Sequence, residues 1–471
     1  MAGRGMRRRW DRFREEMQSR LWPLPVAAIV VAVGLGVGVP ALDRLLDEVL
    51  AGPIDGALFS GQPDSARAML SAISGSIITV TSLVFSLTVV ALQLASSQAS
   101  PRLLRMFTSD RRVHVTLAIF LGTFAYSMTV LPSVRSPNPS VDGDSGFVPR
   151  LAVSLTFLLM LVAVVALTLF LAHLAARLRV ETMLRDVHEE TSHTIRVLFS
   201  QEKPDDGSTA VPARTQVRLT PGRRSGFLVG VERDDLLALA TREDLVISVD
   251  TPVGATVMSG TPLASWWLRD PLQGAGLDDE RIERIDAGIE RAHVVEYERT
   301  PVQDVAFGLR QLVDVAVKAL SPGINDPTTA VHALGHVAAL LGDLVAQPIP
   351  STTERDGDGV VRIVGRQLDL VAMLDLGLTQ PRHYGAADLF VALRLLALLQ
   401  EVGWRTVHDE LRPVIQEHAD AVLAAAERTE RPDADSRRLR AAHAAVAAAL
   451  RGEWTFDDRR PEPSPGRGRR G

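Results

Sequence analysis

The sequence predicts two unlike halves: an α-helical membrane domain with four transmembrane helices, followed by a cytoplasmic α+β region that contains a small β module and a helical domain. Composition is the first reason. Of 471 residues, 46% are hydrophobic but only 5% are aromatic, and the apolar excess lies in the first 175 residues. Long runs there contain no Asp, Glu, Lys or Arg, whereas the remainder has an ordinary charged composition. The second reason is a later change from short β-type runs to helical periodicity.

Four runs are long enough to cross a hydrocarbon core of about 30 Å, which takes roughly 20 apolar residues. A cleaved signal peptide is the alternative for the first run, but no A-x-A site follows it. Buried soluble helices are the alternative for all four, and their alternating flank charges argue against that interpretation. The predicted spans are approximately Leu21–Val39, Ser71–Ala95, Val113–Leu131 and Leu151–Leu174.

The flanking charges orient these spans. Residues 1–20 and the connection "SPRLLRMFTSDRR" are rich in arginine, whereas the first and third connections are acidic or rich in Pro, Ser and Gly. Loops that carry an excess of Lys and Arg stay in the cytoplasm. We therefore expect both termini and residues 175–471 to be cytoplasmic.

The second predicted span carries a polar stripe. At 3.6 residues per turn, its opposite face is apolar and includes Ile73, Ile77 and Val84. In a homo-oligomer the stripe could line a water-filled path. Close helix packing is the alternative, because small hydroxyl residues are also typical of helix interfaces. The stripe lies within an arc of roughly 100°, and its pore-lining candidates are Ser71, Thr79, Ser82, Ser86, Gln93 and Ser97.

Several function classes are disfavoured by what the sequence lacks. No ionisable residue lies in the middle of a predicted span, which favours a passive pore over an ion-coupled transporter. The chain has no cysteine, so disulfides, thiolate metal ligands and cysteine nucleophiles are excluded. A net charge of -5 with mixed signs gives no general attraction to nucleic acid. The lipid bilayer and further copies of the chain are the expected partners.

Composition also divides the chain into predicted regions. The stretch "QEKPDDGSTAVPAR" breaks a helix that continues from the fourth span. The tail "DDRRPEPSPGRGRRG" has the composition of a disordered segment. The regions are a basic N-terminus (1–20), a transmembrane domain (21–174), a helical extension and linker (175–210), the β module (211–270), the helical domain (278–452) and the tail (453–471).

The β module is predicted from the runs "TQVRLT", "SGFLVGV", "DLVISVD" and "GATVMSGTPLASWW". Gly254 and Gly260 fall where a tight β corner needs positive φ. No lysine lies between residues 204 and 317 to carry a prosthetic group, so no covalent cofactor is expected.

The stretch "ALSPGINDPTTA", Ala319–Ala330, predicts a corner between two helices. Pro322 and Gly323 end the first helix, and Asp326 is suited to be the N-cap of a second that runs from about Thr328 to Val345. A binding site is the alternative, because the free N–H groups at a helix start can hold an anion or a polar ligand. Its ligand-binding candidates are Asn325, Asp326, Thr328 and Thr329.

This box, together with "YERTPVQDVAFGLRQLVDVAVKALSPGINDPTTA", "QPRHYGAADLFVALRLLALL" and "TSLVFSLTVVALQLASSQASPRLL", resembles a family of bacterial predicted multi-span membrane proteins with a domain of unknown function. The resemblance covers most of residues 20–400. It implies an integral protein of the bacterial inner membrane with a cytoplasmic C-terminal region. It implies no substrate and no catalytic residue.

Enzyme signals are weak. The histidines of "HEETSH" at residues 188–193 are five apart, whereas H-E-x-x-H needs four. His332 and His336 have the right spacing but no flanking glutamate base, so no metal site is expected. "HYG" at residues 383–385 is a polar cluster or a helix start. Three hypotheses remain: an oligomeric channel with a cytoplasmic regulatory region, a membrane-anchored sensor or scaffold, and, least favoured, an enzyme with an unfamiliar site.

Overall fold

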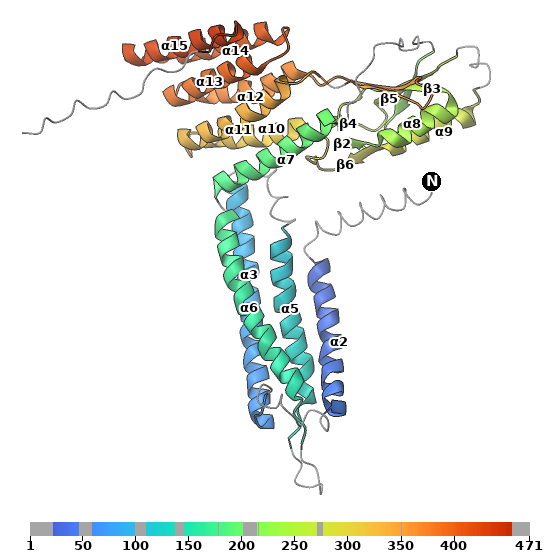
Figure 1. Cartoon of the computed structure of the whole chain (residues 1–471), viewed down its shortest axis with the longest axis vertical. Coiled ribbons are helices and arrows are strands. Elements are labelled where there is room, and N and C mark those ends of the chain that lie inside the picture. The colour runs from blue at the N-terminus through green and yellow to red at the C-terminus, as the bar shows by residue number, and fades with distance from the viewer. Residues whose placement is uncertain are drawn as a thin grey trace, which may run out of the picture. The chain divides into compact units, whose positions relative to one another are not determined.

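The computed structural model divides into two compact units, Met1–Met183 (unit 1) and Leu184–Gly471 (unit 2), shown in Figure 1. The predicted N-terminal region 1–20 and most of the predicted disordered tail lie outside the described residues. The structure describes residues 22–46, 59–98, 110–136, 146–177, 179–200, 214, 216–270, 277–349 and 351–454.

Unit 1 is a bundle of long helices, each of which corresponds to one predicted span, although α2 begins at Pro23 rather than Leu21. α5 packs against the other three, while α3 and α6 also lie side by side (Figure 1). α3 extends beyond the predicted Ser71–Ala95 at both ends. The helices are α2 (Pro23–Leu46), α3 (Pro63–Gln98), α5 (Arg111–Val130) and α6 (Arg150–Arg177).

The first turn of α6 is capped by a residue from another helix. Asp43 of α2 is buried and accepts hydrogen bonds from the backbone N–H groups of Leu151 (3.2 Å) and Ala152 (3.1 Å). The hydroxyl of Tyr126 on α5 donates to the carbonyl oxygen of Ala152 at 3.3 Å. A carboxylate is favourable at a helix N-terminus because it satisfies free N–H groups and complements the helix dipole. These contacts join three helices at one end of the bundle.

Among the described residues, five helices are long and apolar enough to cross a membrane: the four of unit 1 and α11 (Pro327–Val345) of unit 2. α11 differs in its surroundings, because it packs against α10, α12 and α13 (bounds below). Inside the chain, 56% of the apolar stretch of α11 is buried, against 22% for α2, α3 and α6 and 50% for the central α5. α11 is therefore covered about as much as the central α5, and it differs from all four bundle helices in its lower mean hydropathy of 1.3, against 1.6 to 2.8.

The strands of unit 2 form two small sheets. The first has the order β1-β5-β3-β8-β7, antiparallel except for the parallel β3–β8 pair, and the second has the order β4-β2-β6. Their bounds are β1 (Arg218–Pro221), β2 (Gly226–Val231), β3 (Leu245–Val249), β4 (Thr256–Val257), β5 (Pro262–Leu268), β6 (His293–Glu296), β7 (Thr353–Arg355) and β8 (Val361–Gly365).

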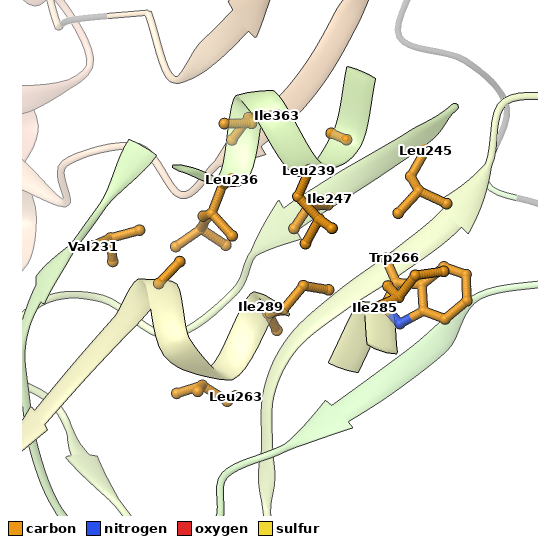
Figure 2. Packing of buried hydrophobic residues seen from close by; sticks show 14 of the residues in the cluster. Val231, Leu236, Leu239, Leu245, Ile247, Leu263, Trp266, Ile285, Ile289 and Ile363 are labelled. Carbon is orange, nitrogen blue, oxygen red and sulfur yellow. The ribbon is translucent and has the colours of Figure 1, made fainter. Parts of the chain in front are cut away.

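Two helices, α8 (Arg233–Glu243) and α9 (Asp279–Ala292), pack with these strands around one apolar core. Figure 2 shows Leu236 and Leu239 of α8 and Ile285 of α9 directed at the strand residues of that core. Trp266 of β5 closes it on one side. Its indole N–H donates to a carboxylate oxygen of Asp286 at 3.0 Å, so burial leaves that donor satisfied.

The predicted β runs coincide with β1 to β5, but the sheet also takes in strands from much later in the chain. β8 follows α11 in sequence, yet Ile363 of β8 lies opposite Ile247 of β3 in the parallel pair. α9 and β6 likewise fall inside the range predicted to be helical and join the β core. Gly254 (φ +89°) and Gly260 (φ +86°) have the predicted positive φ.

Six helices of unit 2 form three consecutive hairpins, which we call the helical stack. α10, α12 and α14 pack in one layer, and α11, α13 and α15 pack in the other (Figure 1). The first four helices each begin after an aspartate whose carboxylate accepts a backbone N–H of the first turn. The helices are α10 (Val305–Ala319), α11 (Pro327–Val345), α12 (Leu370–Gly385), α13 (Leu389–Arg405), α14 (Leu411–Ala426) and α15 (Asp433–Leu450).

Candidate functional site

The two faces of α3 have opposite environments within the chain. Its apolar face is covered by α5 and α6: Ile73, Ile77 and Val84 are buried. The stripe residues are exposed instead, so the polar face is left uncovered by the helices of the same chain. The side chain of Ser97 lies outside the described part of α3. The exposed candidates are Ser71, Thr79, Ser82, Ser86 and Gln93.

Hydroxyl groups on the two faces of α3 make different hydrogen bonds. On the exposed face, Thr79 donates to the carbonyl oxygen of Gly75 (2.8 Å), and Ser82 donates to that of Ile78 (3.0 Å). On the covered face, the hydroxyl oxygens of Ser74 and Ser127 lie 2.7 Å apart and join α3 to α5. The exposed pair satisfies its donors within its own helix, which is compatible with water or lipid alongside.

A partly buried polar cluster lies where α5 begins and α6 ends. We call it the span-end cluster: Asp110, Arg112, His173 and Arg177. The side chains of Asp110 and His173 are only 7% and 11% exposed. One Asp110 carboxylate oxygen, Oδ2, lies 2.6 Å from Nε2 of His173 and 3.3 Å from Nε of Arg177. The cluster therefore ties the first residues of α5 to the last turn of α6.

The hydrogen bonds around His173 define its tautomer. Nη1 of Arg112 lies 3.0 Å from Nδ1 of His173, and a guanidinium can only donate. Nδ1 must therefore accept, which leaves Nε2 to carry the proton that is donated to Asp110. The residues Thr88, Leu92 and Phe170 line a small pocket beside the cluster.

The sequence analysis did not connect His173, which lies at the end of the fourth predicted span, to Asp110. Two local signals were present. His173 and Arg177 have the i,i+4 spacing of one helix face, and Asp110 precedes a predicted helix as an N-cap residue would. Asp110 does cap α5, because it accepts the backbone N–H of Arg112 at 2.9 Å.

The box 319–330 forms the turn between α10 and α11. Asp326 is the N-cap of α11: Oδ1 accepts the backbone N–H of Thr329 (3.0 Å) and Oδ2 accepts its hydroxyl (2.6 Å). The hydroxyl and backbone N–H of Thr329 hold the pKa of Asp326 below its usual range. Asn325 adopts positive φ (49°) and is exposed, as is Thr328. Both oxygens of Asp326 are thus used by its own helix.

The turns of the three hairpins are joined to one another. Gly385, in the "HYG" segment, sits so close to Leu320 and Val391 that a Cβ atom there would collide with both. Arg431, between α14 and α15, donates to the carbonyl oxygen of Ala386 at 3.2 Å. The box and the "HYG" segment are therefore neighbours at one end of the helical stack. His383 and Tyr384 are exposed there, with their rings in edge-to-face contact.

The segment "YERTPVQD" has a structural role that the sequence did not reveal. Arg299 donates from Nε and Nη2 to the carboxylate of Asp304, which also caps α10 through the N–H of Phe307. The side-chain oxygen of Gln303 accepts the backbone N–H of Val231 at 3.2 Å. These contacts attach the start of the helical stack to the β core. In the described part of the chain, no cluster of three or more His, Asp or Glu side chains has the arrangement of a metal site.

Comparison with known proteins places the chain among membrane proteins. A family model described as "Predicted membrane protein (DUF2254)" matches residues 18–401. The chain is similar to the uncharacterized protein Mb1321c of Mycobacterium bovis, with 34% identity over 424 residues, which cover 89% of this chain and 78% of that protein. The same figures hold for the uncharacterized protein Rv1290c of Mycobacterium tuberculosis. No solved structure matches the chain. The family match covers most of the chain, and the protein therefore belongs to the DUF2254 family of predicted membrane proteins.

Proposed function

We propose that the chain assembles as a homo-oligomer in the bacterial inner membrane, where its α3 helices line a passive conduit for ions or small solutes. The uncovered polar face of α3 supports this most directly. In a single chain that face would contact lipid, which offers polar side chains no hydrogen-bond partners. A ring of several copies turns the stripes toward a shared, hydrated axis. One stripe cannot enclose water, so the conduit requires the oligomer.

The proposed membrane topology has four spans, α2, α3, α5 and α6, with both termini in the cytoplasm. α11 is excluded because it has the lowest mean hydropathy of the five candidate helices (1.3) and packs against the other helices of the stack. Reporter fusions after Gly61 and Ser140 are expected to report the outside, and fusions after Thr108 and Phe199 the inside. A further fusion after Ile349 is expected to report the inside. An outside signal there would make α11 a span.

The stripe predicts the properties of the conduit. Its candidates include Ser82, Ser86 and Gln93, which can replace part of an ion's hydration but carry no charge. Without a ring of lining charges, selectivity between ions is expected to be weak. We assign a regulatory role to unit 2, because it follows the last helix of the bundle in the chain and could act on it.

Planar bilayer recordings of the purified protein test the conduit. Ser86→Leu and Gln93→Leu are expected to lower the unitary conductance, because each replaces a polar lining group with an apolar one. Phe85→Leu is the matched control, since Phe85 is exposed on α3 at the edge of the stripe and stays apolar. Cross-linking and size-exclusion chromatography report whether each variant still assembles. A wild type that stays silent across voltage, tension and osmotic conditions refutes the conduit.

A membrane-anchored sensor or scaffold without conduction is the second candidate. Two observations favour it. Thr79 and Ser82 satisfy their hydroxyl donors within α3, so these two residues do not require water. The helical stack also has the two-layered hairpin arrangement by which repeat proteins present binding surfaces. An oligomer that forms through α3 but does not conduct would support this function.

A further inference from the structure

α7 (Val180–Ser200) follows α6 in the chain and packs on the helical stack from Leu184 onward. Its buried residues recur at helical spacing and include Val187, Thr191 and Ile195. Thr191 lies directly against the Cα position of Gly308 on α10, where any Cβ atom would collide with it. Thr194 donates its hydroxyl to the carbonyl oxygen of Pro301 at 3.2 Å. α7 is therefore in close contact with α10 and with the segment that precedes it.

Three histidines gather at this contact. His188 of α7 and His336 of α11 have ring centroids 5.1 Å apart with the rings tilted by 57°. His332 lies one turn before His336 on the same helix. Nδ1 of His188 is buried and has no hydrogen-bond partner among the residues that the structure describes. Its Nε2 lies 3.4 Å from the hydroxyl oxygen of Ser192.

The geometry around His188 offers a hydrogen-bond partner to only one of its two ring nitrogens. When Nε2 carries the proton, Nδ1 has a lone pair and no hydrogen, and it needs no acceptor in the apolar contact. Protonation adds an N–H at Nδ1 that has no acceptor and places a charge beside His336. An unpaired buried donor or charge is costly. Protonating both rings also sets two like charges against each other across the contact.

The charged groups that act on His336 are the two other histidines. Burial, followed by the neighbouring His188 and His332, holds the pKa of His336 below its usual range. On α7, Arg185 pairs with Asp186 (3.9 Å) and Glu189 (3.8 Å). On α10, Asp314 and Lys318 also have partners of their own, as does Glu190 on α7. The charges that act on His336 therefore oppose its protonation.

We propose that His188 and His336 form a proton-sensitive latch that holds α7 on the helical stack at neutral pH and releases it on acidification. Because α7 follows α6 directly, release changes how the membrane bundle is tethered to unit 2. The latch does not depend on the proposed conduit. It applies equally to an anchored sensor.

The direction of the pH effect follows from linkage. A histidine with a depressed pKa in the docked state binds protons more readily once α7 is released. Docking is therefore at full strength above the ordinary histidine pKa of about 6.5 and weakens as the pH falls through the docked value. One pH unit below the ordinary value, release is favoured by up to about tenfold for each histidine that titrates.

Hydrogen exchange of the full-length protein in detergent tests the latch. Amides of α7 are compared with amides of α13 in the same sample at about pH 7.5 and about pH 5.5, on either side of the ordinary histidine pKa of ~6.5. The α13 amides report exchange that does not involve the latch. We expect α7 to lose protection relative to α13 by up to about tenfold per titrating histidine at the lower pH.

Variants identify the groups responsible. In the His188→Gln, His336→Gln double variant, α7 is expected to exchange at nearly the same relative rate at both pH values. His193→Gln is the matched control, because His193 is exposed on the same helix and should leave the wild-type response intact. His336→Gln alone keeps His188 in place and is expected to weaken the response. Circular dichroism and size-exclusion chromatography report folding.

Two results would overturn the latch. One is an unchanged pH response in the folded double variant. The other is protection of α7 that rises with added Zn²⁺ at neutral pH and requires the same histidines, since the pair would then be a metal site. If the double variant does not fold, a wild-type response in a folded His336→Gln variant counts against the latch by itself.

Discussion

α6 and α11 are both helices long and apolar enough to cross a membrane, yet their apolar side chains end in different surroundings. In α6, Leu158 and Leu169 are more than half exposed on the outside of the bundle. In α11, Leu334 and Leu341 are fully buried among the helices of the stack. The same kind of sequence thus serves as an outer surface in one unit and as a core in the other.

The difference shows that apolar composition does not determine what covers an apolar side chain. α11 gains stability from burial against its own chain, which removes apolar area from water. The outward leucines of α6 have no such cover within the chain, and in a membrane protein lipid takes that place. Contacts between the bundle helices depend more on close packing and on hydroxyl pairs such as Ser74 with Ser127.

Matched leucine truncations test this comparison with the largest expected effect. Leu341→Ala should lower the free energy of unfolding of the stack by about 2–5 kcal/mol, because it opens a cavity in a closed core. Leu169→Ala should change stability by no more than about 0.5 kcal/mol, since its side chain leaves no cavity in the chain. Urea unfolding followed by the fluorescence of Trp404 and Trp454, which contact each other in the stack, measures the first.

Folding of the bundle in the Leu169→Ala variant is followed by circular dichroism in the same detergent. Equal losses of stability in the Leu341→Ala and Leu169→Ala variants would contradict this difference between α11 and α6. A large loss for Leu169→Ala alone would mean that another copy of the chain covers that part of α6.

The start of α11 provides a second, smaller test. Asp326→Ala should lower the free energy of unfolding by about 0.5–2 kcal/mol through loss of the N-cap, whereas Asp326→Asn and Asp326→Ser should be mild. Thermal unfolding of the full-length protein measures this. If Asp326→Ser leaves the protein fully folded but abolishes its activity in bilayers, the box is a ligand site as well as a corner.

Acid should weaken the same cap. The pKa of Asp326 is lowered by the hydroxyl and N–H of Thr329, so its contribution to stability is present above the ordinary aspartate pKa of about 3.9. That contribution is lost as the pH falls through the lower folded value. As the pH falls through this range, the free energy of unfolding of Asp326→Asn should therefore decrease less than that of the wild type. Parallel pH curves for the two proteins would contradict the assignment.

The smallest expected effect is in the bundle. Ser127→Ala removes the hydroxyl that pairs with Ser74, and interhelical hydrogen bonds in membranes are worth about 0.6 kcal/mol on average. Thr129→Ala is the matched control on α5, because its hydroxyl donates within its own helix to Ala125. Thermal unfolding in detergent compares the two. A loss for Ser127→Ala as large as that for Leu341→Ala would mean that polar contacts dominate the bundle.

Much of the local structure could be predicted from the sequence, because it depends on neighbouring residues. Helical periodicity separated the apolar face of α3, with Ile77, from the stripe with Ser82. The spacing of Pro322, Asp326 and Pro327 predicted the corner before α11, and the same residues form it in the structure. Each of these features is encoded within one or two helical turns.

Tertiary structure alone decided which distant residues meet. Asp110 and His173 are 63 positions apart in the sequence. β8 pairs with β3 although α11 lies between them in the sequence. The contact of His188 with His336 likewise joins two helices, and nothing in the sequence of either helix indicates that it packs against the other. Periodicity reports which face of an element is apolar but not which element covers it. That choice depends on packing the whole chain at once, which is why two helices that are both apolar enough to cross a membrane, α6 and α11, lie in different surroundings.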